Sequence, residues 1–201
     1  MQYMPLFVKM LDRKVLFIGG GKVALRKARQ FAEAGAQIHV IAPEIEEEFS
    51  NLPKTTTEIR KAVLEDISDD YFAVIFASSD KETNERLSKI CQKKRIMSDR
   101  CDDHTKSDFV TGSITTSGSI INSTISSGIP ALTRYINQEI KALFTPELIK
   151  LNELLMELRP QILASEKLNN TYLNSLVNKN ILERIKKEGI DSLKQEIIAC
   201  L

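Results

Sequence analysis

The residues with the clearest chemical meaning in this sequence are three consecutive glycines, Gly19, Gly20 and Gly21, with Ala24 three positions after the last of them. In a turn from a strand to a helix, the first glycine of a G-x-G-x-x-A pattern permits a tight turn, and Gly21 lets the backbone approach a diphosphate. Ala24 fills the third small position, and the N-terminus of the helix attracts the phosphate charge. The pattern indicates a dinucleotide site; the alternative is a tight turn in an α/β protein that binds no nucleotide. The predicted cofactor contacts in this turn are Gly19, Gly20, Gly21, Lys22, Val23 and Ala24.

A second group of reactive side chains lies in the middle of the sequence, where Cys101 is followed by Asp102, Asp103 and His104. Carboxylates and imidazoles are the proton acceptors that general-base chemistry uses near neutral pH. From the residues alone, a capping or solvated role for the two aspartates is the simpler interpretation. Mixed ligands with a single cysteine in one polar loop are not typical of a structural metal site, so we predict no metal. His39, inside an apolar run, is interpreted as a packed residue.

Hydrophobic patterning predicts the elements that position these residues. Residues 14–18 and 38–42 are apolar runs typical of buried strands, and residues 25–34 between them repeat apolar side chains at helical spacing until Gly35. Residues 72–77 form another continuous apolar run, as expected of a strand buried on both faces of a parallel sheet. The glycine turn is thus preceded by a strand and followed by a helix and a second strand. In this order the glycine motif indicates a nucleotide-binding βαβ unit much more strongly than it does alone.

Further alternation of strands and helices predicts the fold class, an α/β, Rossmann-type doubly wound parallel sheet over residues 1–108. The additional elements expected are strands at 57–60 and 95–98 and a helix at 81–93. Ligands of such sheets bind at the carboxyl ends of the strands. The loops expected to line one crevice begin at Gly19, Ala42, Ser78 and Arg100.

After residue 108 the pattern predicts a dimerisation region over residues 109–145. Residues 109–115 and 119–126 are expected strands of a short hairpin, and a helix is expected from Ile129. This small segment offers more apolar surface than it can bury alone, which favours a homodimer. Packing of the same surface on the first domain is the alternative.

The remaining residues, 146–201, are predicted to form a helical C-terminal domain. Pro146 lies near the start of its first helix, where proline is tolerated. A leucine stripe in that helix is expected to end before Pro160, and shorter helices are expected through residues 162–163 and beyond, with Gly189 separating the last two.

The composition of the chain limits the kinds of partner, and the cell compartment, that we expect for it. The formal net charge of +1 gives no reason to expect a nucleic-acid partner, since there is no broad basic excess. No apolar run approaches the ~20 residues that cross a bilayer, so no membrane partner is expected. The three cysteines show no C-x-x-C spacing and fit a reduced, cytoplasmic protein.

Taken in order, several segments of the chain resemble the precorrin-2 dehydrogenase module that occurs alone or at the N-terminus of siroheme synthases. The resemblance runs from Met4 to about Leu158. It is carried by Met4-Pro5-Leu6-Phe7, Gly19-Gly20-Gly21, Ile41-Ala42-Pro43-Glu44, Ala77-Ser78-Ser79-Asp80 with Asn84, Arg95-Ile96 leading to Asp102, and Ser127-Gly128 with Pro130 and Arg134.

The resemblance implies NAD-dependent oxidation of precorrin-2 to sirohydrochlorin by a homodimer. Asp102 is then the expected catalytic residue, as a proton acceptor or a stabiliser of positive charge, with His104 as the alternative base. No arginine follows the second strand to bind a 2′-phosphate, so NAD is favoured over NADP. Further cofactor contacts are expected from Pro43, Glu44, Ser78, Ser79, Asp80 and Asn84, and contacts to the substrate carboxylates from Arg100, Ser127 and Arg134.

The chain also departs from the family pattern. Where the family usually has an apolar strand with an asparagine before the key aspartate, residues 97–102 read Met-Ser-Asp-Arg-Cys-Asp. Two other functions stay open: a dehydrogenase that also inserts Fe²⁺ or Co²⁺, using Asp102 for both steps, and a non-catalytic NAD-binding regulatory module that dimerises through its C-terminal part.

Overall fold

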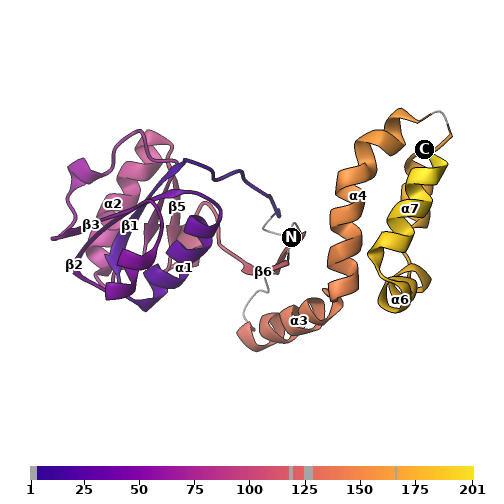
Figure 1. Ribbon diagram of the computed structural model, residues 1–201. Coiled ribbons are helices and arrows are strands. Elements are labelled where there is room, and N and C mark those ends of the chain that lie inside the picture. Colours follow the sequence, from indigo (N-terminus) through magenta and orange to yellow (C-terminus); the bar gives the residue numbers. More distant parts are fainter. Residues whose placement is uncertain (1–3, 118–119, 125–128, 166) are drawn as a thin grey trace. The chain divides into compact units, whose positions relative to one another are not determined.

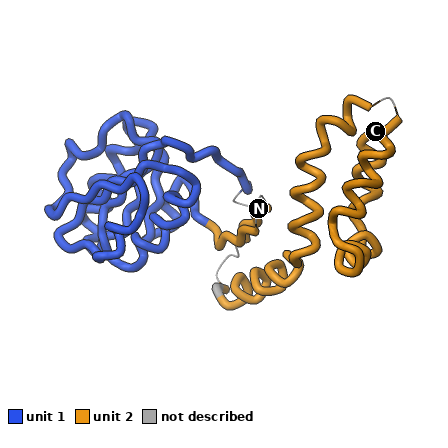
Figure 2. The backbone as a smooth tube through the Cα atoms, in the orientation of Figure 1, with its two compact units in different colours: residues 1–111 blue, residues 112–201 orange. Residues whose placement is uncertain are grey.

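The computed structural model describes residues 4–117, 120–124, 129–165 and 167–201. The chain divides into two compact units, Met1–Thr111 and Gly112–Leu201 (Figure 2). Each unit has its own secondary structure and its own buried apolar residues.

The first unit is built on a five-stranded parallel sheet with the strand order β3-β2-β1-β4-β5. The chain runs outward from β1 to β3 on one side and then returns to β4 and β5 on the other, which is the doubly wound order predicted from the sequence. The strands are β1 (Lys14–Gly20), β2 (Gln37–Ile45), β3 (Thr55–Ile59), β4 (Ala73–Phe76) and β5 (Met97–Arg100).

Two helices cover opposite faces of this sheet, α1 (Lys22–Glu33) and α2 (Lys81–Lys94) (Figure 1). Side chains alternate across a strand, so β1 contributes Phe17 to the apolar core under α1 and Leu16 to the core under α2. Both faces of the central strands are therefore buried, which explains why the sequence there is continuously apolar.

The fifth strand begins two residues later than the expected 95–98. Arg95 follows the last turn of α2 in the left-handed conformation (φ 57°), so the chain cannot enter the sheet before Met97. The strand then continues through Asp99 and Arg100, both buried. Charged residues in a buried strand are not predicted by hydrophobic pattern, and their ion pairs are described below.

Three short 3-10 helices complete the first unit: η1 (Glu47–Asn51), η2 (Leu64–Asp66) and η3 (His104–Lys106). The last of these lies between β5 and the end of the unit. Phe109 packs against the core under α1. The stretch 109–112 is therefore not part of the hairpin, whose first strand starts later than predicted.

The second unit contains the hairpin strands β6 (Ser113–Ser117) and β7 (Ile120–Thr124), and the elements described after them are helices. Four helices, α4 to α7, share one apolar core that includes Leu154, Ile162, Ile185 and Ile197. The helices are α3 (Pro130–Leu143), α4 (Pro146–Ala164), α5 (Asn170–Ser175), α6 (Lys179–Glu188) and α7 (Ile190–Cys200).

The expectation that the leucine stripe ends before Pro160 is wrong. Helix α4 continues through Pro160 to Ala164, so residues 162–163 belong to it and not to a separate helix. Leu158 and Ile162, on either side of the proline, are both buried in the helical core, and this packing offsets the missing backbone hydrogen bond. Within the described ranges, none of the helices combines the length and apolar character needed to span a bilayer.

Candidate functional site

The turn after β1 brings two loops of the sheet edge together. Gly19 has φ +113°, a conformation that favours glycine, and a Cβ at this position would lie 2.6 Å from the carbonyl carbon of Ala77. The carboxyl end of β1 therefore rests directly on the first residues after β4. A side chain at Gly19 would separate them.

The N-terminus of α1 is open for an anion. Gly21 occupies the N-cap with φ −82°, no side chain caps the helix, and its first turn contains no acidic residue. A Cβ at Gly21 would meet nothing within 4 Å. Free backbone N–H groups, the positive end of the helix dipole and open space are what a diphosphate requires, so this turn fits a dinucleotide.

The end of β2 lies on the other side of the glycine turn. Gly20 pairs with Ile45, and a Cβ on Gly20 would lie 2.6 Å from the carbonyl oxygen of Glu44. The strand runs to Ile45, further than the expected 38–42, so Pro43 and Glu44 are strand residues with exposed side chains. Both lie at the same sheet edge as the glycine turn.

The residues after β4 are held by local hydrogen bonds. Asp80 caps α2, accepting from the backbone N–H of Thr83 at 3.0 Å, and its own N–H donates to the Ser78 hydroxyl at 3.1 Å. The buried Asn84 donates its Nδ2 to the Ser78 carbonyl at 2.9 Å, while its Oδ1 has no hydrogen-bond partner among the described residues. Ser79 is exposed beside them. The polar turn after β4 is thus preorganised next to the glycine turn.

Asp102 lies just beyond the carboxyl end of β5 and is held by Arg100. The Arg100 guanidinium donates from Nε to Asp102 Oδ1 at 2.9 Å and from Nη2 to Oδ2 at 2.8 Å. This bidentate pair holds the pKa of the Asp102 carboxyl below its usual range, with a smaller contribution from the side chain of Asn84. Asp102 is therefore a charged group and a weakened proton acceptor.

Arg100 is not the loop residue that the sequence suggested. It is the last residue of β5, and its side chain is 3% exposed. Its Nη1 donates to Glu85 Oε2 at 3.0 Å and to the Ser88 hydroxyl at 3.1 Å, both on α2. The donors that would bind a substrate carboxylate are thus engaged with protein groups.

Glu85 connects this arginine to a second cation. Lys106 Nζ donates to Glu85 Oε2 at 2.8 Å, and Lys106 and Arg100 together lower the pKa of Glu85 to about 2. A shallow hollow opens over this group at the N-terminal half of α2. It is lined by Lys81, Glu82, Glu85, Arg100, Asp102, Asp103 and Lys106.

Sequence reasoning missed a buried ion pair between α1 and β5. Lys27 Nζ lies 2.6 Å from Asp99 Oδ2, with side-chain exposures of 7% and 0%, and also donates to the Thr111 hydroxyl at 2.7 Å. A signal was available, because Lys27 follows Ala24 by three residues and precedes Phe31 by four, which places it on the core face of α1. The pair attaches the nucleotide-binding helix to the strand that leads to Asp102.

The remaining predicted residues are dispersed. His104 is exposed, and its Nδ1 lies 3.8 Å from Asp99 Oδ1. His39 hydrogen-bonds Glu58 and Tyr71 on β3 and before β4, in keeping with a packed role. Arg134 is an exposed residue of α3, in the second unit, and Ser127 lies outside the described residues.

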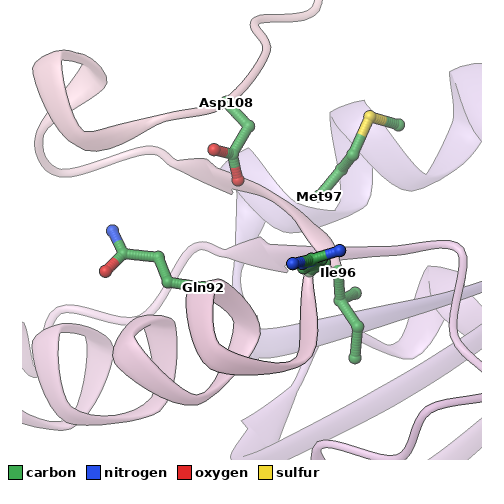
Figure 3. Close-up of a pocket in the computed structure, with 5 residues that line it drawn as sticks. Gln92, Ile96, Met97 and Asp108 are labelled. Carbon is green, nitrogen blue, oxygen red and sulfur yellow. The ribbon is translucent and has the colours of Figure 1, made fainter.

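Another hollow lies at the opposite edge of the sheet (Figure 3). Gln92 comes from the end of α2 and Met97 from the start of β5, so this hollow is at the amino ends of the strands. Asp108 at its rim accepts hydrogen bonds from the backbone N–H and hydroxyl of Ser98 at 2.9 and 3.0 Å. It has no part in the glycine-turn site. Among the residues that the structure describes, no group of three or more His, Cys, Asp or Glu is placed to hold a metal ion.

The doubly wound sheet and the glycine turn over an open helix N-terminus define a dinucleotide-binding α/β domain. Comparison with known proteins agrees: the chain belongs to the family described as "Putative NAD(P)-binding", whose model matches residues 6–113. The family resemblance drawn from the sequence is confirmed at this level.

Related proteins extend this assignment. The siroheme synthase of Tolumonas auensis is 35% identical over 163 residues, which are 81% of this chain and 35% of the relative. Siroheme synthase 2 of Aeromonas hydrophila is 31% identical over 162 residues, 80% of this chain and 34% of the relative. The chain thus spans about a third of the length of these relatives. The solved structure of SirC, precorrin-2 dehydrogenase, shares the fold, with a TM-score of 0.74, 17% identity and coverage of 96% of this chain and 100% of that one.

Proposed function

We propose that this protein is an NAD-dependent precorrin-2 dehydrogenase, which oxidises precorrin-2 to sirohydrochlorin in siroheme biosynthesis. The observation that carries the proposal is an ionised, oriented carboxylate, Asp102, at the same sheet edge as the glycine turn of an NAD(P)-binding family member. The siroheme synthase relatives and the fold shared with SirC supply the substrate class.

NAD rather than NADP is the proposed cofactor because of the segment that follows β2. Residues 41–53 contain no lysine or arginine, but four glutamates, Glu44, Glu46, Glu47 and Glu48. A 2′-phosphate would be repelled there, whereas a carboxylate near the end of the second strand suits the ribose hydroxyls of NAD. Calorimetry with both nucleotides tests this, and an equal affinity for NADP would overturn it.

The reaction removes a hydride and a proton from the macrocycle. Bound NAD supplies the hydride acceptor. Asp102, fully charged at neutral pH, stabilises the positive charge that develops on a pyrrole nitrogen as the hydride leaves. Its lowered pKa makes it a weaker base, so this electrostatic role is favoured over proton acceptance, and the proton passes to the exposed His104 or to solvent water.

The test is anaerobic incubation of precorrin-2 with NAD, followed by the formation of NADH and the absorption of sirohydrochlorin. Asp102→Asn removes the charge but keeps the shape, and should lower turnover by about 10²–10⁴-fold with NAD affinity unchanged. Asp70→Asn is the matched control, since Asp70 is an exposed partner of Lys14 elsewhere in the unit. Normal turnover by Asp102→Asn, with a loss in His104→Ala, would transfer the role to His104.

The same assay separates the other functions. NAD binding without oxidation of precorrin-2 by the wild-type chain would favour a regulatory module. Fe²⁺ added to the product tests metal insertion as a separate step.

We also propose that the protein acts as a cytoplasmic homodimer that pairs through its hairpin and α3. Support comes from exposed apolar side chains on these elements: Ile114, Ile121, Leu132, Tyr135 and Leu143. Light scattering should show a dimer at micromolar concentration, and Ile121→Arg should dissociate it. Ile59→Arg, a matched change at an exposed residue of β3, should leave the dimer intact. A fully active wild-type monomer would contradict the proposal.

A further inference from the structure

We propose that Arg100 is a positioning residue, which fixes the Asp102 carboxylate against α2 in a single orientation, and that it does not bind the substrate. The inference rests on the proposed function, because it assigns Arg100 a role in the site where Asp102 acts. It replaces the substrate contact expected from the sequence.

The geometry of the guanidinium supports this role. Its Nε and Nη2 form a planar fork with both oxygens of Asp102, at 2.9 and 2.8 Å. A two-point contact of this kind fixes the rotation of the carboxylate as well as its position. A single hydrogen bond or a lysine would fix only the distance.

The arginine is itself anchored at both ends. Its backbone N–H donates to the Ser107 hydroxyl at 2.7 Å, and the strand that carries it pairs with β4. Its remaining terminal nitrogen, Nη1, is held by Glu85 and Ser88. Glu85 is in turn held by Lys106, so the contacts with α2 fix the position of the guanidinium.

Burial argues against a direct contact with substrate. Both side chains line the hollow, but that of Arg100 is only 3% exposed and that of Asp102 is 12% exposed, so the carboxylate is the more accessible of the two. A substrate carboxylate would have to displace Asp102 or Glu85 to reach the guanidinium. Displacement of Asp102 would leave a largely buried carboxylate without its arginine partner.

The experiment compares wild type with Arg100→Gln and Arg100→Lys in the precorrin-2 assay across pH. Arg100→Gln should lower kcat by about 10–10²-fold, since misplacement of a reacting group by an ångström has effects of this size. KM for precorrin-2 should stay within threefold of wild type, roughly, because no substrate contact is lost. The acid limb of the kcat profile should move to higher pH, and Arg100→Lys should restore its position but not the full kcat.

Arg60→Gln is the matched control, because Arg60 also binds a carboxylate bidentately, Asp66 at 2.8 and 2.6 Å, at an exposed place of the same unit. It should leave kcat, KM and the pH profile unchanged. A large rise in KM with kcat retained in Arg100→Gln would overturn the proposal and assign Arg100 to substrate binding.

A second measurement is independent of turnover: the carboxyl ¹³C titration of Asp102, assigned with Asp102→Asn. Its pKa should be below the usual range in wild type and should rise in Arg100→Gln. An unchanged titration would overturn the positioning role. If wild type binds NAD but never oxidises precorrin-2, the proposed function fails, and the titration still decides whether Arg100 holds Asp102. Should Arg100→Gln not fold, Ser88→Ala removes one anchor of the guanidinium and should give a smaller fall in kcat, with unchanged KM.

Discussion

Gly21 offers a substitution that separates cofactor binding from folding. Its backbone is extended (φ −82°, ψ −175°), a Cβ there meets nothing within 4 Å, and α1 has no side-chain cap. Aspartate is among the preferred N-cap residues, and replacing glycine by it stabilises a helix by about a few tenths of a kcal/mol. Gly21→Asp should therefore fold at least as stably as wild type.

The same substitution should abolish NAD binding. A carboxylate about 5 Å from one phosphate charge is repelled by roughly 3 kcal/mol at an effective dielectric constant of about 20. At ~1.4 kcal/mol per factor of ten, this repulsion alone weakens binding by roughly a hundredfold. The diphosphate carries a second charge, and the aspartate also occupies part of its space and satisfies the N–H groups it would use.

Calorimetry with NAD and urea unfolding measure the two effects. Gly21→Asn keeps the cap and most of the bulk without the charge, so its affinity should fall between those of Gly21→Ala and Gly21→Asp. An NAD affinity of Gly21→Asp close to that of wild type would refute the placement of the diphosphate. A loss of stability in the same variant would refute the open space at this helix end.

Three further predictions concern stability. Lys27→Met leaves the buried Asp99 without its lysine partner, so urea unfolding should show a loss of about 3–5 kcal/mol, and Lys27→Met combined with Asp99→Leu should be more stable than the single variant. Gly19→Ala should be destabilised by about 1–3 kcal/mol in the same assay, because φ is +113° and the new methyl group would meet the backbone of Ala77. Glu85 has a folded-state pKa of about 2 against an ordinary value of 4.5, so its contribution to stability is complete above about pH 4.5 and is lost as pH falls toward 2. Urea unfolding over this pH range should show a shallower loss in Glu85→Gln; an unchanged slope would contradict the assignment.

The fold of the first unit could be predicted wherever burial is apolar. Strands β1 and β4 are continuous apolar runs because helices cover both faces of the sheet, and the sequence shows this directly. Strand β5 was placed too early, because its last residues, Asp99 and Arg100, are charged and become compatible with burial only through partners on the helices. The prediction that the helix ends before Pro160 was wrong for a similar reason, because the tertiary packing of Leu158 and Ile162 lets α4 continue through the proline.

The candidate site divides in the same way. The glycine turn depends on local spacing, so its place between β1 and α1 could be predicted from the sequence. The partners of Asp102 could not, because Glu85 lies 15 residues from Arg100, and no periodicity relates a strand end to a helix face in another part of the chain. Lys27 lies 72 residues from Asp99, and its helical spacing indicated burial without naming the partner.

The opposite charges of Asp99 and Arg100 have a consequence for how β5 finds its place in the sheet. The two residues are adjacent, so they face opposite sides: Asp99 meets Lys27 of α1, and Arg100 meets Glu85 of α2. If the strand slipped by one residue, every side chain would change face. A slip in one direction would put Arg100 at the position that faces Lys27, and a slip in the other direction would put Asp99 at the position that faces Glu85, so either slip replaces an attraction by a repulsion. An apolar strand at this position would tolerate such a slip far better. In this protein, charge repulsion disfavours the shifted register of β5 while the sheet assembles.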